Sequence, residues 1–348
     1  MCNTEACDDM DPHLEECTEI ITFDPDGNLY LHVGTDVEPL TKTYLVCSKA
    51  LSRASRVFKK MLYGCFAESR PSDGKYAWTV DLPEDRQEAL ELMLHIIHVN
   101  FDLVPEHLQI TQLYEFLITA DKYDTFAIAK PWAHRWMEAV KSDAQDPFLL
   151  VVAYLMGDSE LFRKMSLQAS THCHLDDDRD LAFCSLGENQ EIRAHKLREI
   201  DSFIPGGLLE DLAFIREALV MEALGPYVAL YRTLKEDRWC KCSLQDSKLC
   251  DGLLLGSLIR SLAARGFDII KPDPVKAYRG RVSSLKFITN VELHTFPHAE
   301  PSIDGQQALF HTLDEAVDRS LTEDMNLLLL KYNAHLTERA LQTGLHMS

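Results

Sequence analysis

The sequence lacks any apolar run long enough to cross a lipid bilayer. Its longest notable run is Phe148–Met156, whereas a membrane-spanning helix needs about 20 apolar residues. The first residues, Met1–Glu19, are acidic and lack the basic start and apolar segment of a secretory signal. The chain contains 10 cysteines. Without an export signal we expect these to be reduced thiols in an intracellular protein, cytoplasmic or nuclear.

An excess of positive charge is also lacking. Lys and Arg number 35 against 55 Asp and Glu, which gives a formal net charge of −20 at pH 7. A surface of this sign repels nucleic-acid phosphates and anionic lipid headgroups. We therefore expect neither direct nucleic-acid binding nor membrane association.

The common catalytic and phosphate-binding motifs are missing as well. Gly206-Gly207 is not followed by the Lys-Ser/Thr pair of a P-loop. The segment 183–187 departs at its first position from the Gly-x-Ser-x-Gly pattern of serine hydrolases. The His-Glu-x-x-His pattern of zinc proteases is absent. We predict no catalytic residues and hence a non-enzymatic protein.

At 348 residues the chain is long enough for two domains. Its 46% apolar and 26% charged residues are typical of globular proteins. We expect an acidic flexible tail over residues 1–19, a first domain over 20–141 and a helical domain over 146–348. The second domain begins at Asp146-Pro147, where a helix cap precedes a proline suited to the first helical position.

The first domain is organised around residues 43–70. Residues 43–46 have the β-branched and aromatic start of a short strand, and residues 29–33 alternate apolar with polar as a second strand does. A helix is predicted from Ser55, with one apolar stripe formed by Val57, Phe58, Met61 and Leu62. The sum is a small sheet with helices packed around it, an α+β fold.

Segments across residues 20–140 resemble the BTB/POZ domain, in the form common among fungal proteins with a single N-terminal copy. The matching segments are Gly27–Gly34, Tyr44–Leu51, Ala54–Phe58, Asp81–Asp85, Ile96–His98 and Ala120–Asp124. The chain differs from the animal form at Asn28, where Asp is usual, and at Cys47, where His is usual. The resemblance implies a BTB/POZ fold and a role in protein–protein interaction.

The triplet Phe66-Ala67-Glu68 follows the helix predicted from Ser55. In BTB domains that recruit cullin scaffolds of ubiquitin ligases, a hydrophobic-x-Glu triplet lies in the loop after this helix. The resemblance thus implies partner-binding roles for Phe66 and Glu68, with Val57 and Met61 beside them. An apolar anchor with an acid at its rim suits a binding hot spot. In the alternative interpretation, Phe66 packs on its own domain and Glu68 faces solvent.

After residue 140 strand patterns are almost absent, so we expect the second domain to be all-α. The predicted helices are Phe148–Met156, Ser159–Ala169, Leu208–Leu224 with a continuation beyond Gly225-Pro226, Leu253–Ala264, Gln306–Ser320 and Glu323–Leu341. By analogy with ubiquitin-ligase adaptors, the resemblance implies a BACK-like start to this domain, which would orient the domains or hold a second partner.

Three cysteines of the second domain, Cys240, Cys242 and Cys250, form a candidate metal site. A structural zinc site needs four ligands, usually including a Cys-x2–4-Cys pair. The Cys-x-Cys spacing is tighter, and a fourth ligand would come from His172, Cys173, His294 or His298. Structural zinc, a disulfide, and buried or free thiols all stay open.

Together these observations favour a protein–protein interaction module that either forms a homodimer or recruits a cullin scaffold as a ubiquitin-ligase substrate adaptor. One alternative is a nuclear or transcriptional scaffold that oligomerises without a cullin. A more remote alternative is a metal-dependent enzyme that uses the cysteines at 240–250, which would require a metal with an open coordination position.

Overall fold

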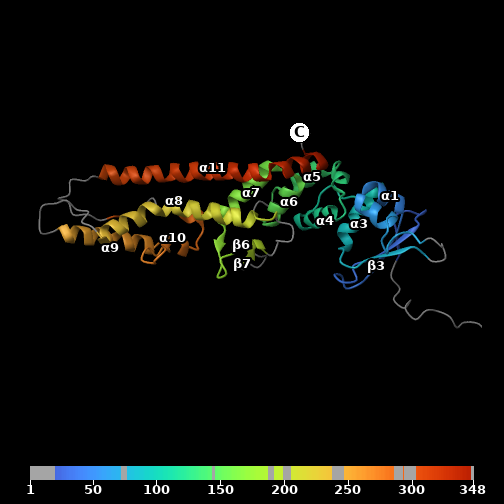
Figure 1. The fold of residues 1–348 in the computed structure, drawn as a ribbon, viewed down its shortest axis with the longest axis horizontal. Coiled ribbons are helices and arrows are strands. Elements are labelled where there is room, and N and C mark those ends of the chain that lie inside the picture. Colours follow the sequence, from blue (N-terminus) through green and yellow to red (C-terminus); the bar gives the residue numbers. More distant parts are fainter. Residues whose placement is uncertain are drawn as a thin grey trace, which may run out of the picture. The chain divides into compact units, whose positions relative to one another are not determined.

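The computed structural model describes residues 20–71, 77–142, 146–186, 192–198, 205–236, 247–285, 293 and 303–345 (Figure 1). The chain divides into two compact units. The first comprises residues 1–142 together with 339–348, and the second comprises residues 143–338. Helices and a smaller number of strands make up the described residues, so the fold is mixed α+β as expected.

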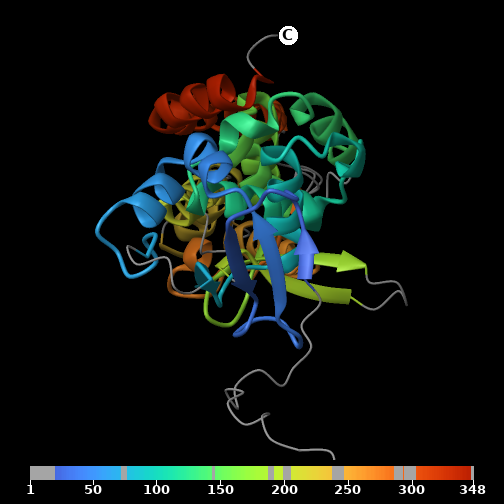
Figure 2. The same cartoon turned by 90° about the vertical axis from the view of Figure 1, so that its right-hand side faces the viewer.

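The first unit contains a four-stranded mixed sheet. Its strands are β1 (Ile20–Thr22), β2 (Leu29–Val33), β3 (Lys42–Val46) and β4 (Thr79–Leu82). The strand order is β1-β3-β2-β4, with β2 antiparallel to β3 and parallel to β4. Figure 2 shows these strands in blue, side by side. Leu29, Leu31 and Val33 are fully buried on one face of β2, as the alternation predicted.

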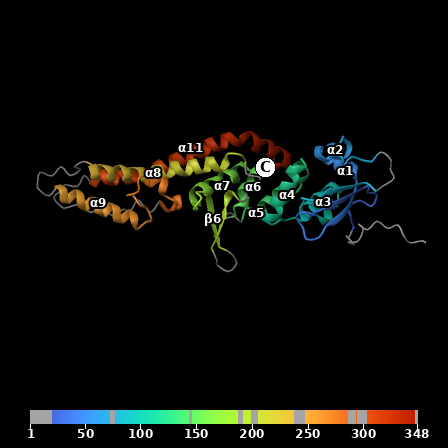
Figure 3. The same ribbon diagram turned by 60° about the horizontal axis from the view of Figure 1, so that its bottom comes forward.

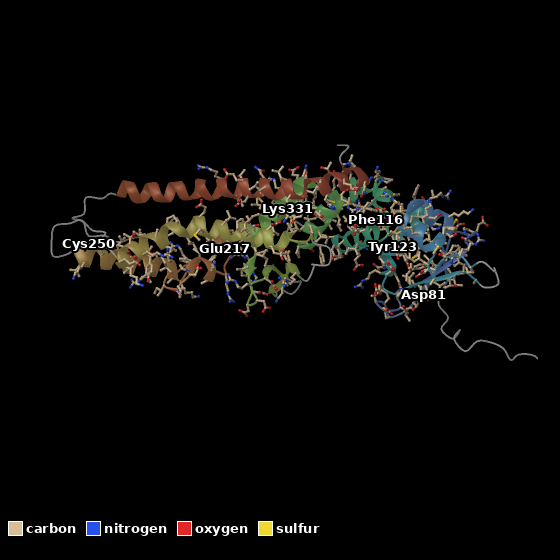
Figure 4. The ribbon with its side chains drawn as sticks, in the orientation of Figure 1. Asp81, Phe116, Tyr123, Glu217, Cys250 and Lys331 are labelled. Carbon is tan, nitrogen blue, oxygen red and sulfur yellow. The ribbon has the colours of Figure 1, made fainter. Side chains whose placement is uncertain are left out.

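Helices pack around this sheet. They are α1 (Ser48–Ala54), α2 (Arg56–Tyr63), α3 (Gln87–Ile97), α4 (Ile110–Lys122) and α5 (Ala133–Val140), with short 3₁₀ segments at Phe101–Leu103 and Phe126–Ala129. Aromatic side chains fill the space between them. Phe116 meets Trp136 edge to face with ring centroids 5.2 Å apart, and Phe116 and Tyr123 are labelled in this region in Figure 4.

The last described residues of the chain belong to the first unit. Arg339 pairs with Asp121 at 2.5 Å, and its guanidinium lies 3.7 Å from the centre of the Phe126 ring. Thr343 is fully buried, and Gly344 follows with a φ of 80° that favours glycine. The expected helical domain, 146–348, included these residues, whereas the second compact unit ends at residue 338.

The second unit is dominated by helices. They are α6 (Phe148–Met156), α7 (Ser159–His172), α8 (Leu208–Glu236), α9 (Ser247–Ala263), α10 (Pro274–Ala277) and α11 (Ile303–Thr343), of which α11 ends in the first unit. Two of them, α8 and α9, lie alongside each other (Figure 3). None of the helices in the described ranges is both long and apolar enough to span a membrane.

The expectation that the second domain is all-α is wrong. Strands β5 (His174–Leu175), β6 (Leu181–Leu186) and β7 (Ile192–Lys196) form an antiparallel sheet in the order β5-β6-β7. These strands are short and contain few β-branched residues. Their strand state therefore comes from pairing with each other rather than from local preference.

Candidate functional site

The α1–α2 hairpin is fixed to the domain by Ser55, the residue between its two helices. The Oγ of Ser55 accepts a hydrogen bond from the Phe58 N–H at 2.9 Å, which caps the start of α2. The same hydroxyl donates to the carbonyl of Tyr123 at 2.5 Å. The Phe58 ring stacks on the Tyr123 ring with centroids 4.2 Å apart. The hairpin is thus attached to the end of α4 by one polar and one aromatic contact.

The side chain of Asn28 and the backbone of Cys47 help to place α1. The Asn28 side chain accepts a hydrogen bond from the Ser48 N–H at 3.0 Å, at the start of α1. The Cys47 N–H donates to Nε2 of His98 at 3.0 Å, and Nδ1 of His98 donates to the Leu94 carbonyl at 2.9 Å. These contacts require a neutral His98 ring with its proton on Nδ1. Burial lowers the pKa of His98, which favours the same neutral form.

The apolar stripe predicted on α2 is divided between the core and the surface. Phe58 and Leu62 are fully buried, whereas Met61 is half-buried and Val57 is 37% exposed. Val57 and Met61 therefore flank the buried pair and present apolar surface to solvent. Both residues remain available for contact with a partner.

A braced turn follows α2 at residues 64–70. The Ser69 hydroxyl accepts from the Phe66 N–H at 3.2 Å and lies 2.9 Å from the Gly64 carbonyl and 3.1 Å from the Met61 carbonyl. The Trp78 indole N–H donates to the Glu68 carbonyl at 2.9 Å. Hydrogen bonds within the turn and a hydrogen bond from Trp78 therefore fix the conformation of this turn.

Phe66 and Glu68 occupy different environments on this turn. The Phe66 side chain is 60% exposed, although it is a large aromatic residue, whereas Glu68 is half-buried. Tyr63, at the end of α2, is also exposed, and its hydroxyl lies 2.7 Å from that of Ser48. The hairpin and turn thus carry four apolar side chains that are exposed or half-buried, here together called the hairpin surface: Val57, Met61, Tyr63 and Phe66.

Positive charge borders the hairpin surface. Between residues 39 and 67 the sequence contains no acid, and its basic residues are Lys42, Lys49, Arg53, Arg56, Lys59 and Lys60. Lys59 and Lys60 are exposed on α2, and Arg56 makes only an exposed ion pair with Asp124 at 3.4 Å. In a chain whose formal net charge is −20, this local excess makes the surface attractive to acidic partners.

A second feature of the first unit was not predicted from the sequence. A hollow of about 290 Å³ between α3 and α4 is lined by Glu88, Glu91, His95 and Glu115, among others. Glu91 is already engaged, since its carboxylate accepts from Lys42 at 2.7 Å and from the Tyr44 hydroxyl at 2.8 Å. Burial lowers the pKa of His95. The hollow is therefore acidic, in contrast to the basic hairpin surface.

The predicted metal ligands are only partly within the described residues. Cys250 is buried near the start of α9 (Figure 4), whereas Cys240 and Cys242 lie outside the described residues, as do His294 and His298. Of the other proposed fourth ligands, Cys173 is fully buried and His172 is exposed. The zinc site at 240–250 stays a prediction.

Within the described ranges of the chain, one acidic group has ligand atoms close enough together to hold a metal ion, namely Asp176, Asp178 and Asp180. Protein cations already occupy it. Lys196 lies 2.7 Å from the carboxylate of Asp176 and 2.9 Å from that of Asp178, and Arg198 lies 3.2 Å from Asp180. The hydrogen bond from Lys196 lowers the pKa of Asp176. A metal ion would have to displace these side chains.

Comparisons of the chain with models of protein families, with curated proteins and with solved structures gave no match.

Proposed function

We propose that the chain is a non-enzymatic interaction protein whose first unit is a BTB/POZ domain of the fungal type. In this proposal the hairpin surface binds a cullin scaffold, and the second unit holds a substrate or a second partner, as in a ubiquitin-ligase adaptor. The small mixed sheet with helices packed around it is compatible with the fold that the sequence resemblance implies.

The observation that carries the proposal is Phe66 on its braced turn. Burying a phenylalanine side chain fully is worth roughly 1.5–3 kcal/mol, so an aromatic ring left 60% exposed is a strong potential anchor. The hydrogen bonds of Ser69 and Trp78 hold the turn in one conformation before binding. Little ordering entropy then remains to be lost when a partner docks.

The charges around Phe66 describe the partner that would fit. An apolar pocket would accept the ring, and acidic residues around that pocket would face Lys59 and Lys60 across the interface. Glu68, the first acid after the basic stretch, lies two residues from the anchor. It would fix the register of docking by meeting a cation or a donor on the partner.

The alternatives differ in what they predict. A nuclear or transcriptional scaffold that self-associates without a cullin would keep its oligomeric mass when the Phe66 turn is altered. A metal-dependent enzyme would contain bound metal, which elemental analysis of the purified protein measures. The described residues supply no further observation in favour of either one.

The test is titration of the full chain with the N-terminal domain of a cullin scaffold, with mass measured by light scattering in the same samples. The F66A/E68K double variant should bind at least about tenfold more weakly, a loss of about 1.4 kcal/mol. F214A is the matched control, because Phe214 is an equally aromatic, 70% exposed residue on α8. It should bind as the native chain does.

Absence of binding by the well-folded native chain would overturn the cullin proposal. Equal weakening by F66A/E68K and F214A would show that exposed aromatic residues act without specificity, and would overturn the assignment to the hairpin surface. A native dimer that persists in every variant, without cullin binding, would favour the self-associating scaffold.

A further inference from the structure

The second unit buries an arginine that has no acidic partner among the described residues. Arg216 on α8 is 3% exposed. Its Nη2 donates to the Gly280 carbonyl at 2.5 Å, and its guanidinium lies 5.7 Å from the centre of the Tyr278 ring. Its Nε, also buried, has no hydrogen-bond partner among the described residues. A buried cation in this situation is costly unless an anion accompanies it.

The arginine lines a pocket of about 110 Å³. Two more cations, Arg179 and Lys276, line the same pocket, together with Tyr278 and one acid, Glu217. Glu217 is labelled on α8 in Figure 4. At about 30 Å³ per water molecule the space holds three or four waters. The volume suits a small oxyanion, or the oxyanion end of a larger molecule.

Arg179 is held toward this pocket by the turn that contains it. The backbone of this residue has a φ of 69°, which is uncommon for a residue other than glycine. Within the turn, the Arg179 N–H donates to the Asp176 carbonyl at 3.1 Å. Its own Nη2 donates to the Lys276 carbonyl at 3.0 Å. This contact joins the turn to α10, which also supplies Lys276 to the pocket.

The acids near the pocket are mostly engaged by other cations. Asp176 and Asp178 pair with Lys196, Asp180 pairs with Arg198, and Asp177 pairs with Arg279 at 2.8 Å. Lys276 has an exposed ion pair with Asp273 at 3.9 Å, a distance at which the attraction is weak. Among the residues that line the pocket, three cations therefore face one carboxylate.

We propose that this pocket is a binding site for a phosphate-class oxyanion, with Arg216 as its buried ligand and Arg179 and Lys276 at its mouth. A guanidinium presents N–H groups in a planar fork that matches the oxygens of such anions. The lining residues carry a net charge of two positive units, from three cations and Glu217. A phosphate monoester carries about −1.5 to −2 at pH 7, which matches this charge better than a carboxylate does.

Two further observations agree with the proposal. Burial has the largest influence on the pKa of Arg216 and lowers it, and the neighbouring Arg179 adds to this effect, whereas Tyr278 and Cys173 act in the opposite direction. The Gly280 carbonyl and the Tyr278 ring orient the side chain. Nε itself is buried and has no hydrogen-bond partner among the described residues.

The test is calorimetric titration of the full chain with inorganic phosphate at constant ionic strength, in parallel with glycerol phosphate and acetate. Phosphate should bind, and R179Q and K276Q should each weaken its binding about tenfold, since each removes one charge-assisted contact. Both residues are exposed, so these variants should fold. R216M should abolish binding. R163Q, which removes an exposed arginine on α7 outside the pocket, is the matched control and should bind as the native chain does.

Binding of glycerol phosphate as well would support a site that accepts the phosphoryl end of a larger molecule, and binding of inorganic phosphate alone would support a site for the free ion. The proposal is overturned if the native chain binds no phosphate, if acetate binds as tightly as phosphate, or if R163Q weakens binding as much as R179Q does. The variants R179Q and K276Q keep the test valid even if R216M fails to fold.

Discussion

The candidate sites of the two compact units differ in the kind of group that they leave without a partner. In the first unit several buried polar groups have partners, as Asp85 has in Lys122 at 2.8 Å and in the Tyr123 hydroxyl at 2.9 Å. The same unit leaves Phe66 in water. In the second unit the acids of the 176–180 turn have cationic partners, while Arg216 is buried with its Nε unpaired among the described residues.

This difference indicates two kinds of ligand. An exposed aromatic ring on a rigid turn gains free energy when apolar surface covers it, which is the contact another protein provides. A buried, partly unpaired guanidinium gains free energy from an anion small enough to enter its pocket. The first unit is therefore suited to a macromolecular surface, and the second to a small charged group.

The largest expected effect is a difference in the free energy of unfolding between a variant at a buried residue of the hairpin and a variant at an exposed one. F58A removes a fully buried ring stacked on Tyr123, and we expect it to lower the free energy of unfolding by about 3–5 kcal/mol. V57A, one residue earlier and 37% exposed, should change that free energy by no more than about 0.5 kcal/mol. Urea denaturation of both variants measures this contrast, and similar losses in the two would show that Val57 is a core residue.

A smaller effect should distinguish the two proposed sites by the response of their binding affinity to salt. Exposed charges such as Lys59 and Lys60 are screened as the Debye length falls from about 10 Å at 0.1 M salt to about 3 Å at 1 M. Raising NaCl between these limits should weaken partner binding at the hairpin surface about tenfold. Phosphate binding at the buried Arg216 should weaken by less, about two- to threefold. A salt response of the same size at both sites would contradict the assignment of a buried ligand to the second unit.

Local sequence patterns predicted the first unit better than the second. The alternation of Leu29, Leu31 and Val33 with polar residues indicated a half-buried strand, and β2 spans the predicted residues 29–33. The apolar run Phe148–Met156 also forms a helix with the predicted bounds. The alternation in the strand matches its alternating burial, and the continuous apolar run matches a helix that is buried along most of its length. In both cases the local preference and the tertiary packing agree.

The predictions from sequence failed where tertiary packing outweighs the local structural preference of the residues. Gly225-Pro226 predicted a break, yet α8, a helix of 29 residues, continues through this position. Leu224, Tyr227 and Val228 are buried around the proline. Packing of an apolar face stabilises a helix more than the local preference of single residues does. The strands β6 and β7 were missed for the related reason that their pairing is not a local property.

The candidate sites depend on contacts between residues far apart in sequence. Phe66-Ala67-Glu68 could be found as a triplet, but the exposure of Phe66 depends on bracing by Ser69 and Trp78. Arg216 is an ordinary helix residue in the sequence. Its burial involves Gly280, which lies 64 residues further along the chain. No spacing rule relates these two positions, so the pocket became evident only in the structure.

The smallest expected effect is a dependence of the stability of the first unit on pH, which tests whether the folded state requires a neutral His98. Burial lowers the pKa of His98 below its usual 6.5, and Nε2 of the ring accepts a hydrogen bond from the Cys47 N–H. A lowered pKa in the folded state means that the unfolded chain binds more protons, so stability is complete above pH 6.5 and declines as the pH falls below it. The free energy of unfolding should therefore be lower at pH 5.5 than at pH 7.5.

H98Q removes the titrating ring but keeps a side-chain acceptor, so its unfolding free energy should depend less on pH over this interval. H134Q is the matched control, because it replaces a histidine that is exposed on α5. Urea denaturation at the two pH values measures all three chains. If H98Q kept the pH dependence of the native chain, protonation of His98 would not be the cause of that dependence. His95, whose pKa is also lowered by burial, would then be the residue to replace.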